Sequence, residues 1–242
     1  MQGMVPLSGF GGVPYSAVRK AAPRNILDNS DFTNLVAQAG IGGNHGTVAY
    51  AADRWILDSG TVSYAEGVGL TLNGTIRQKL ERIPAAAYPY IGMASGEASI
   101  SYDNGTVSIT SSGGVIKWAA LYTGEYSRAT MPEYQPKGYS AELTACRRYY
   151  RLYNFPQWSV SGCYVSNINT LVLTIDYDTM RVTPSVSMTG SFACATLGDG
   201  INFNACEFSG NAVNLRQSGS YSNAAGMMYA STEVSIALSA DL

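Results

Sequence analysis

Acidic side chains are the first residues to test for chemistry, because glycoside hydrolysis requires two carboxylates that face each other across a cleft. The chain offers many candidates but no spacing that singles out a pair; they include Glu66, Glu81, Glu97, Glu125, Glu133 and Asp176. Asp176 and Asp178 share one face of a predicted strand, yet both lie beside a turn, where Asp side chains bond to the backbone. The carboxylates therefore give no reason to expect a glycoside hydrolase.

The single histidine, His45, lies in the glycine-rich stretch 42–46. A catalytic histidine needs a nucleophile and an orienting carboxylate beside it, and the sequence identifies neither. We therefore predict that His45 is an ordinary loop residue. The sequence also contains no P-loop, no G-x-S-x-G elbow, no H-E-x-x-H motif and no dinucleotide fingerprint. These observations predict that the protein is not an enzyme.

The cysteines do not form a metal site by spacing. Cys146, Cys163, Cys194 and Cys206 include no C-x-x-C pair, and one histidine cannot complete a Cys/His set. We expect buried free thiols and no cofactor. A disulfide such as Cys194 with Cys206 is the alternative, because sequence does not fix pairing.

Aromatic side chains are the remaining candidates for binding, because an exposed ring offers an apolar face against which a sugar ring can stack. The chain has 17 Tyr and 3 Trp. We predict ligand contacts at Trp158, Tyr126 and Tyr134, with further candidates at Tyr88, Tyr90, Tyr122 and Trp118. The alternative is that these rings pack in the core or in a subunit interface.

The charge balance argues against two classes of partner. The chain has 15 basic and 17 acidic residues and a formal net charge of -2, so it lacks the excess of Lys and Arg that nucleic-acid binding requires. No uninterrupted apolar run is long enough to cross a bilayer. We predict neither nucleic-acid binding nor membrane insertion.

An amphipathic helix pattern in 139–153 divides two tracts of short strands and turns. Ser140 is a good N-cap, and Glu142 lies in the first turn, where the helix dipole favours a carboxylate. One apolar face recurs at helical spacing and comprises Leu143, Cys146, Tyr149, Tyr150 and Tyr153. The basic residues near the end of the pattern form either a salt-bridged solvent face or an inter-subunit contact; they are Arg147, Arg148 and Arg151.

The tracts on both sides of this helix have β-strand patterns. Asn73-Gly74 and Asp103-Asn104-Gly105 predict tight turns, and residues 106–110 alternate as in a half-buried strand. We expect Trp55 in the core with Asp53 and Arg54 as a polar clasp; a sugar platform on Trp55 is the alternative. After the helix, two strands have one apolar face each, formed by Leu171, Leu173, Ile175 and Tyr177 and by Val234, Ile236, Leu238 and Ala240. The fold prediction is all-β, with an N-terminal arm (1–24), a β-sandwich compatible with a jelly roll (25–138), a connecting helix (139–153) and a C-terminal β-domain (154–242).

Several short motifs resemble those of phage tail-fibre and related virion structural proteins. They are N-I-L-D-N-S-D-F at 25–32, A-D-R-W at 52–55, W-A-A-L-Y-T-G at 118–124 and M-R-V-T-P at 180–184, together with E-L-T-A-C-R-R-Y-Y at 142–150. The resemblance implies a jelly-roll domain followed by a second β-domain in a homotrimer. It also implies a protein made in the bacterial host cytoplasm that becomes part of the virion, contacts other virion proteins and adheres to host-surface glycans.

Two other functions are left open at this point. A capsid decoration or head-fibre protein would share the fold and use the arm 1–24 as an anchor. A secreted bacterial carbohydrate-binding module would be monomeric. The opening at 25–32 also resembles carbohydrate-binding jelly rolls that can hold a structural calcium, which would place Asp28 and Asp31 near the ion; turn capping by both side chains is the alternative.

Overall fold

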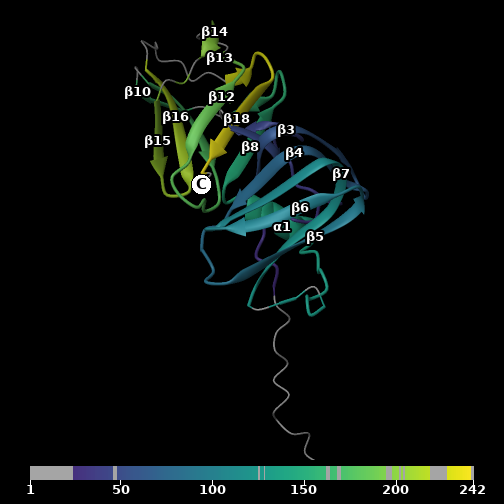
Figure 1. The fold of residues 1–242 in the computed structure, drawn as a ribbon. Helices are drawn as coiled ribbons and strands as arrows, with labels where there is room; N and C mark the ends of the chain where they lie inside the picture. The colour runs from purple at the N-terminus through teal and green to yellow at the C-terminus, as the bar shows by residue number, and fades with distance from the viewer. Residues whose placement is uncertain are drawn as a thin grey trace, which may run out of the picture.

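The computed structural model describes residues 24–45, 48–124, 126–127, 129–161, 164–167, 170–194, 198–201, 203, 205–218 and 228–240. Within these residues the chain forms many antiparallel strands and one short helix, so the all-β prediction is confirmed (Figure 1). The predicted arm 1–24 lies outside the described residues except for Arg24. No helix among the described residues is long and apolar enough to cross a membrane.

The first part of the chain forms one seven-stranded antiparallel sheet with the order β1-β2-β3-β4-β7-β5, in which β6 pairs with the beginning of β7. Its strands are β1 (Asn44–His45), β2 (Val48–Ala52), β3 (Trp55–Ala65), β4 (Gly69–Lys79), β5 (Ala87–Ser95), β6 (Ala98–Asp103) and β7 (Thr106–Thr123). Alternate residues of these strands face a core that includes Leu70, Leu72, Ile76, Val107 and Ile109. The period of two that the sequence predicts at 106–110 is therefore present.

The segment before the first strand closes this core. Phe32 donates its backbone N–H to the carbonyl of Lys117, and Ala119 donates to the carbonyl of Ser30, so the segment lies along β7. Trp55 is fully buried and packs edge-on against Phe32, with ring centroids 5.3 Å apart. The core position of Trp55 is confirmed, and its alternative as a sugar platform is wrong.

One of the two predicted glycine turns is wrong. Asn73 and Gly74 lie in the middle of β4, where Gly74 pairs with Gly60 of β3. A Cβ atom on Gly60 would lie 1.8 Å from the carbonyl oxygen of Asn73, so the glycine pair permits a close approach of two long strands. The other turn is confirmed: Asn104 (φ 41°) and Gly105 (φ 79°) join β6 to β7 with the positive φ angles of a tight hairpin.

The helix is shorter than the pattern predicts. Helix α1 spans Tyr139–Cys146, its N-cap is Gly138 rather than Ser140, and Tyr150–Phe155 is strand β8. Strand β8 pairs along its whole length with β18 (Val234–Ser239). This pairing satisfies the backbone of Tyr150 and Tyr153 in extended form, so tertiary structure overrides their helical spacing.

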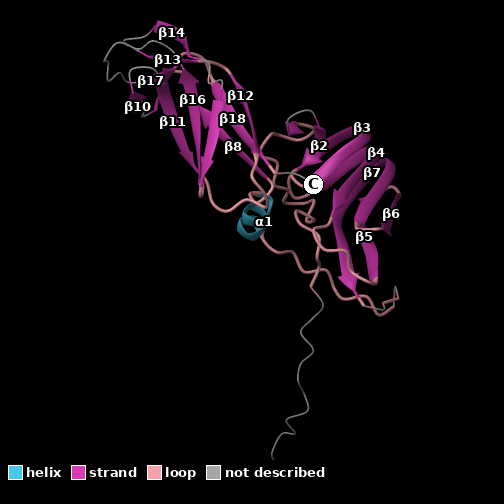
Figure 2. Cartoon of the chain, turned by 90° about the vertical axis from the view of Figure 1, so that its left-hand side faces the viewer, coloured by secondary structure: helices cyan, strands magenta, loops and turns pink. Residues whose placement is uncertain are grey.

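The second part of the chain contains three antiparallel sheets, with orders β10-β11-β16-β15, β12-β18-β8 and β14-β13-β17-β9. The remaining strands are β9 (Val160–Ser161), β10 (Tyr164–Asn167), β11 (Thr170–Asp176), β12 (Ser185–Thr189), β13 (Phe192–Cys194), β14 (Gly198–Ile201), β15 (Ala205–Ser209), β16 (Ala212–Ser218) and β17 (Met228–Ala230). Both predicted apolar faces, on β11 with Tyr177 and on β18 with Ala240, are buried in one core. Figure 2 shows α1 between the two β-rich parts.

Candidate functional site

Trp158 is the most exposed large aromatic residue among those described, with 67% of its surface accessible. It lies in a turn that follows β8, in which Ser159 donates its backbone N–H to the carbonyl of Pro156. The φ angle of Trp158 is 67°, in the left-handed region. Turns of this form normally place glycine at that position, and a bulky residue there is strained by about 1–3 kcal/mol. The fold thus holds a large ring in solvent on a strained backbone.

Several contacts fix this turn against β17. Trp158 donates its backbone N–H to the carbonyl of Ala230 (2.8 Å), and Ala230 donates back to the carbonyl of Ser159 (3.0 Å). The Gln157 amide donates to the carbonyl of Ser231 at 2.9 Å. The indole of Trp158 stacks on the ring of Tyr229, with centroids 5.4 Å apart and planes 23° apart. We call Trp158 and Tyr229 the aromatic platform.

The platform suits stacking against a flat, partly apolar ligand. An aromatic face that is already oriented loses little conformational entropy on binding, because its side chain has only two rotatable bonds. The C–H-rich face of a sugar ring is such a ligand. Sequence reasoning found Trp158 but missed Tyr229, because no strand was predicted for the residues of β17.

The other two predicted binding residues pack against the first β-sheet. Tyr134 stacks on Trp118 with centroids 4.7 Å apart, and burial raises its pKa. Trp118 in turn lies against Gly92, where an added Cβ would meet the indole at 2.2 Å. Tyr126 is partly buried and lies edge-on to Tyr122 at 6.2 Å. These contacts favour the packing alternative for both residues.

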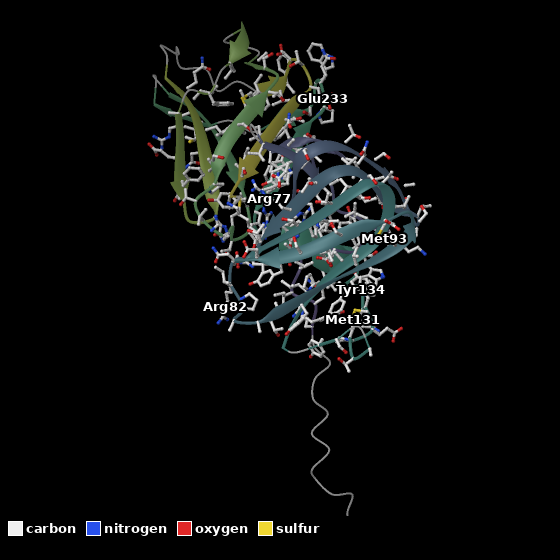
Figure 3. All side chains as sticks on the ribbon, in the orientation of Figure 1. Arg77, Arg82, Met93, Met131, Tyr134 and Glu233 are labelled. Carbon is white, nitrogen blue, oxygen red and sulfur yellow. The ribbon has the colours of Figure 1, made fainter. Side chains whose placement is uncertain are left out.

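The predicted binding residues do not form one site. Tyr126 and Tyr134 lie in the segment between β7 and α1, whereas Trp158 follows β8 and contacts β17. In Figure 3, Tyr134 is labelled at the lower part of the molecule and Glu233, in the turn between β17 and β18, is labelled at the upper part. Only Trp158 of the three is part of the aromatic platform.

The sequence predicted His45 as an ordinary loop residue, and this prediction is wrong. His45 ends the short strand β1, is buried (4% exposed), and its ring lies between Tyr50 and Tyr150, with centroids 3.9 and 3.5 Å away. Its Nε2 lies 3.6 Å from Oδ1 of Asp53. Because Tyr150 begins β8, this aromatic stack joins the two β-rich parts of the chain.

Asp53 and Arg54 form the predicted polar clasp, although it is more extensive than expected. Asp53 accepts hydrogen bonds from the backbone N–H and the side-chain amide of Gln38, at 3.0 and 2.7 Å. Arg54 lies 3.4 Å from the ring centroid of Tyr149 and donates to the carbonyl of Lys79. Both residues are buried, and their contacts link the turn before Trp55 to β4 and to the turn after α1.

Glu142 is buried at the same junction. One carboxylate oxygen accepts the backbone N–H of Asn29 at 2.7 Å, and the other has no hydrogen-bond partner. Burial raises the pKa of this carboxyl, whereas the bond from Asn29 and the charge of Lys137 oppose the rise. At 1% exposure Glu142 is closed to solvent, which suits a structural role.

Asp28 and Asp31, the residues considered for calcium, both have protein partners. Asp28 lies 3.3 Å from the ammonium of Lys137 and 3.6 Å from Nε of Arg54. Asp31 accepts the backbone N–H and the hydroxyl of Thr33, which is turn capping. Among the described residues, no group of three or more His, Cys, Asp and Glu side chains is placed to hold a metal.

The arginines after α1 make the predicted salt bridges. Arg148 pairs with Glu81 at 3.1 Å and Arg151 with Asp178 at 2.8 Å. The hydrogen bond and the charge of Arg151 lower the pKa of Asp178. Asp176 and Asp178 both line a cleft of about 660 Å³. The acid of a glycosidase pair has a raised pKa, whereas Arg151 shifts the pKa of Asp178 in the opposite direction.

Two of the four cysteines can be assigned. Cys146 and Cys206 carry free thiols. Cys146 is buried as expected, whereas Cys206 is exposed, so the prediction of buried thiols is wrong for Cys206. Burial raises the pKa of the Cys146 thiol well above its ordinary value. The Cys194–Cys206 disulfide is therefore not formed. Cys163 lies outside the described residues.

Comparisons with protein-family models, with curated proteins and with solved structures return no match for this chain. The functional conclusion therefore depends on the geometry of its own residues.

Proposed function

We propose that this chain is a non-enzymatic adhesion protein of the phage tail-fibre type, which binds host-surface or environmental glycans by contact alone. The observation that carries the proposal is the aromatic platform: Trp158 is two-thirds exposed on a left-handed backbone and is supported by Tyr229. A fold rarely keeps a bulky residue in this conformation without a functional reason. Stacking on a preformed ring would supply the contact with sugar.

A glycan array tests this function directly. We expect the wild-type protein to bind a subset of neutral or mixed oligosaccharides, and Trp158→Ala to lose that binding because the stacking face is gone. Tyr139→Ala is the matched control, since Tyr139 is an aromatic residue of α1 that is 46% exposed and lies outside the platform. Equal array signals for wild type and Trp158→Ala would contradict the proposed function.

We further propose that the protein acts as a homotrimer in a virion, where it contacts other virion proteins. Weak contacts with single sugars then multiply when three platforms engage one cell surface. Light scattering tests the assembly, because three chains of 25.7 kDa have a mass of about 77 kDa. A monomer at both low and high salt would overturn the trimer and favour a carbohydrate-binding module.

We also infer that residues 25–138 are a relative of the jelly roll. The support is an antiparallel sheet of seven strands, with the segment before β1 bonded along β7 as a further edge. An experimental structure that includes the arm 1–24 would test whether a second layer of strands completes the sandwich.

A further inference from the structure

A cleft of about 600 Å³ opens at the junction of the two β-rich parts, away from the aromatic platform. Residues from five separate segments line it: the segment before β1, the β2–β3 turn, the β4–β5 loop, the end of β7 and the turn after α1. Three arginines, Arg54, Arg82 and Arg148, belong to this lining. We call it the arginine cleft.

Arg54 forms the buried part of the arginine cleft and carries a donor without an acceptor. The residue is 5% exposed, and its backbone is left-handed with φ 73°. One terminal nitrogen donates to the carbonyl of Lys79 at 2.8 Å, but Nε has no hydrogen-bond partner and lies 3.6 Å from the Asp28 carboxylate. A buried guanidinium N–H without an acceptor favours a ligand that supplies one.

The mouth of the cleft has spare positive charge. Arg148 uses one nitrogen to bond both carboxylate oxygens of Glu81, at 3.1 and 3.3 Å, and half of its side chain is exposed. Arg82 is exposed and makes no ion pair with any described residue. The lining thus contains three guanidinium groups and two carboxylates, those of Asp28 and Glu81. The cleft is complementary to a single anionic group, and a guanidinium can bind a planar carboxylate through two parallel hydrogen bonds.

Part of the cleft lining is apolar. Leu80, Ile83 and Pro84 line it, and Ile83 is 61% exposed. Thr123 and the exposed part of Glu81 add hydroxyl and carboxylate groups at the edge. An apolar wall with a few placed polar groups and an excess positive charge matches a ring that carries hydroxyls and one carboxylate.

We infer that the arginine cleft binds the carboxylate of a sugar acid, such as a uronic acid residue of an acidic glycan. The carboxylate lies between Arg82 and Arg148, close to the buried guanidinium of Arg54, and the ring packs against Ile83 and Pro84. This site is separate from the aromatic platform and does not require it, so either site can fail while the other holds.

Isothermal titration calorimetry on the full chain tests the site, with D-glucuronate as the probe. Comparison ligands are glucose, the methyl ester of glucuronate and glucose 6-phosphate. Arg82→Ala and Arg148→Ala remove exposed cations at the mouth and leave the core intact. Arg77→Ala is the matched control: Arg77 lies on β4 and pairs with Asp58 at 3.1 Å, and Figure 3 labels it apart from Arg82 at the edge of the molecule.

We expect glucuronate to bind and each of the two cleft variants to weaken it by about tenfold or more, because a hydrogen bond between charged groups is lost. Arg77→Ala and Trp158→Ala should bind glucuronate as the wild type does, and glucose and the methyl ester should not compete. The inference would be overturned if glucuronate did not bind or if its methyl ester bound equally well. It would also be overturned if only glucose 6-phosphate bound, or if neither cleft variant changed the binding of glucuronate.

Discussion

Replacement of His45 by alanine should test whether the aromatic stack joins the two β-rich parts of the chain. The ring of His45 lies 3.9 Å from Tyr50 and 3.5 Å from Tyr150, nearly parallel to both, and is buried. Each aromatic contact is worth about 0.5–1.5 kcal/mol beyond burial, and removal of a buried ring also leaves a cavity. We expect His45→Ala to lower the free energy of unfolding by about 3 kcal/mol.

The assay is thermal and urea unfolding at neutral pH. For a chain of this size, 3 kcal/mol corresponds to a fall in Tm of about 6–12 °C. His45→Phe keeps both stacked contacts and should recover more than half of the loss. Val48→Ala is the control, since Val48 pairs with His45 across β1 and β2 but is 42% exposed. A His45→Ala protein within about 0.5 kcal/mol of wild type, the range of ordinary surface substitutions, would refute the reasoning.

Two further predictions concern the first domain and the junction. Burial raises the pKa of Glu142, so the folded state favours its neutral form. The stability that the protonated carboxyl contributes is fully present below the unfolded pKa of about 4.3 and is lost as pH rises through the folded pKa. The Glu142→Gln protein should therefore become more stable relative to wild type as pH rises from 4 to 7, as measured by urea unfolding. A difference in the free energy of unfolding that does not change with pH would contradict the burial of this carboxyl. Gly60→Ala should lower the free energy of unfolding by about 3 kcal/mol or more, since the added Cβ would lie 1.8 Å from the carbonyl oxygen of Asn73. Gly67→Ala, at φ 74° with open space around it, should lose only about 1 kcal/mol; equal losses would show that strand approach is not the constraint.

Local patterns in the sequence predicted the strands whose side chains alternate strictly. Residues 171–177 and 234–240 each have one apolar face, and both faces are buried as expected. Asn104-Gly105 was predicted as a turn because its positive φ angles can be read from residue type. Asn73-Gly74 has the same composition but pairs with a distant glycine, Gly60. No local pattern shows which glycine lies across a sheet.

The site was only partly predictable for the same reason. Trp158 could be chosen as an aromatic residue, but its exposure and left-handed backbone depend on the turn after β8 and on β17, which lies about 70 residues further along the chain. The helical spacing of Tyr150 and Tyr153 was real but was overridden by the pairing of β8 with β18. His45 was assigned to a loop because glycines surround it, whereas Tyr150, which covers its ring, is more than 100 residues away.

The most direct test of glycan binding by the aromatic platform uses the indole N–H signals of the three tryptophans in a nitrogen-15 NMR spectrum. Trp55 is fully buried and Trp118 is covered by Tyr134, so each residue reports on a different environment. On titration with the strongest oligosaccharide from the array, we predict that the Trp158 signal shifts in a saturable manner while those of Trp55 and Trp118 stay in place. Saturable binding that leaves the Trp158 signal unchanged would contradict the proposed role of the platform.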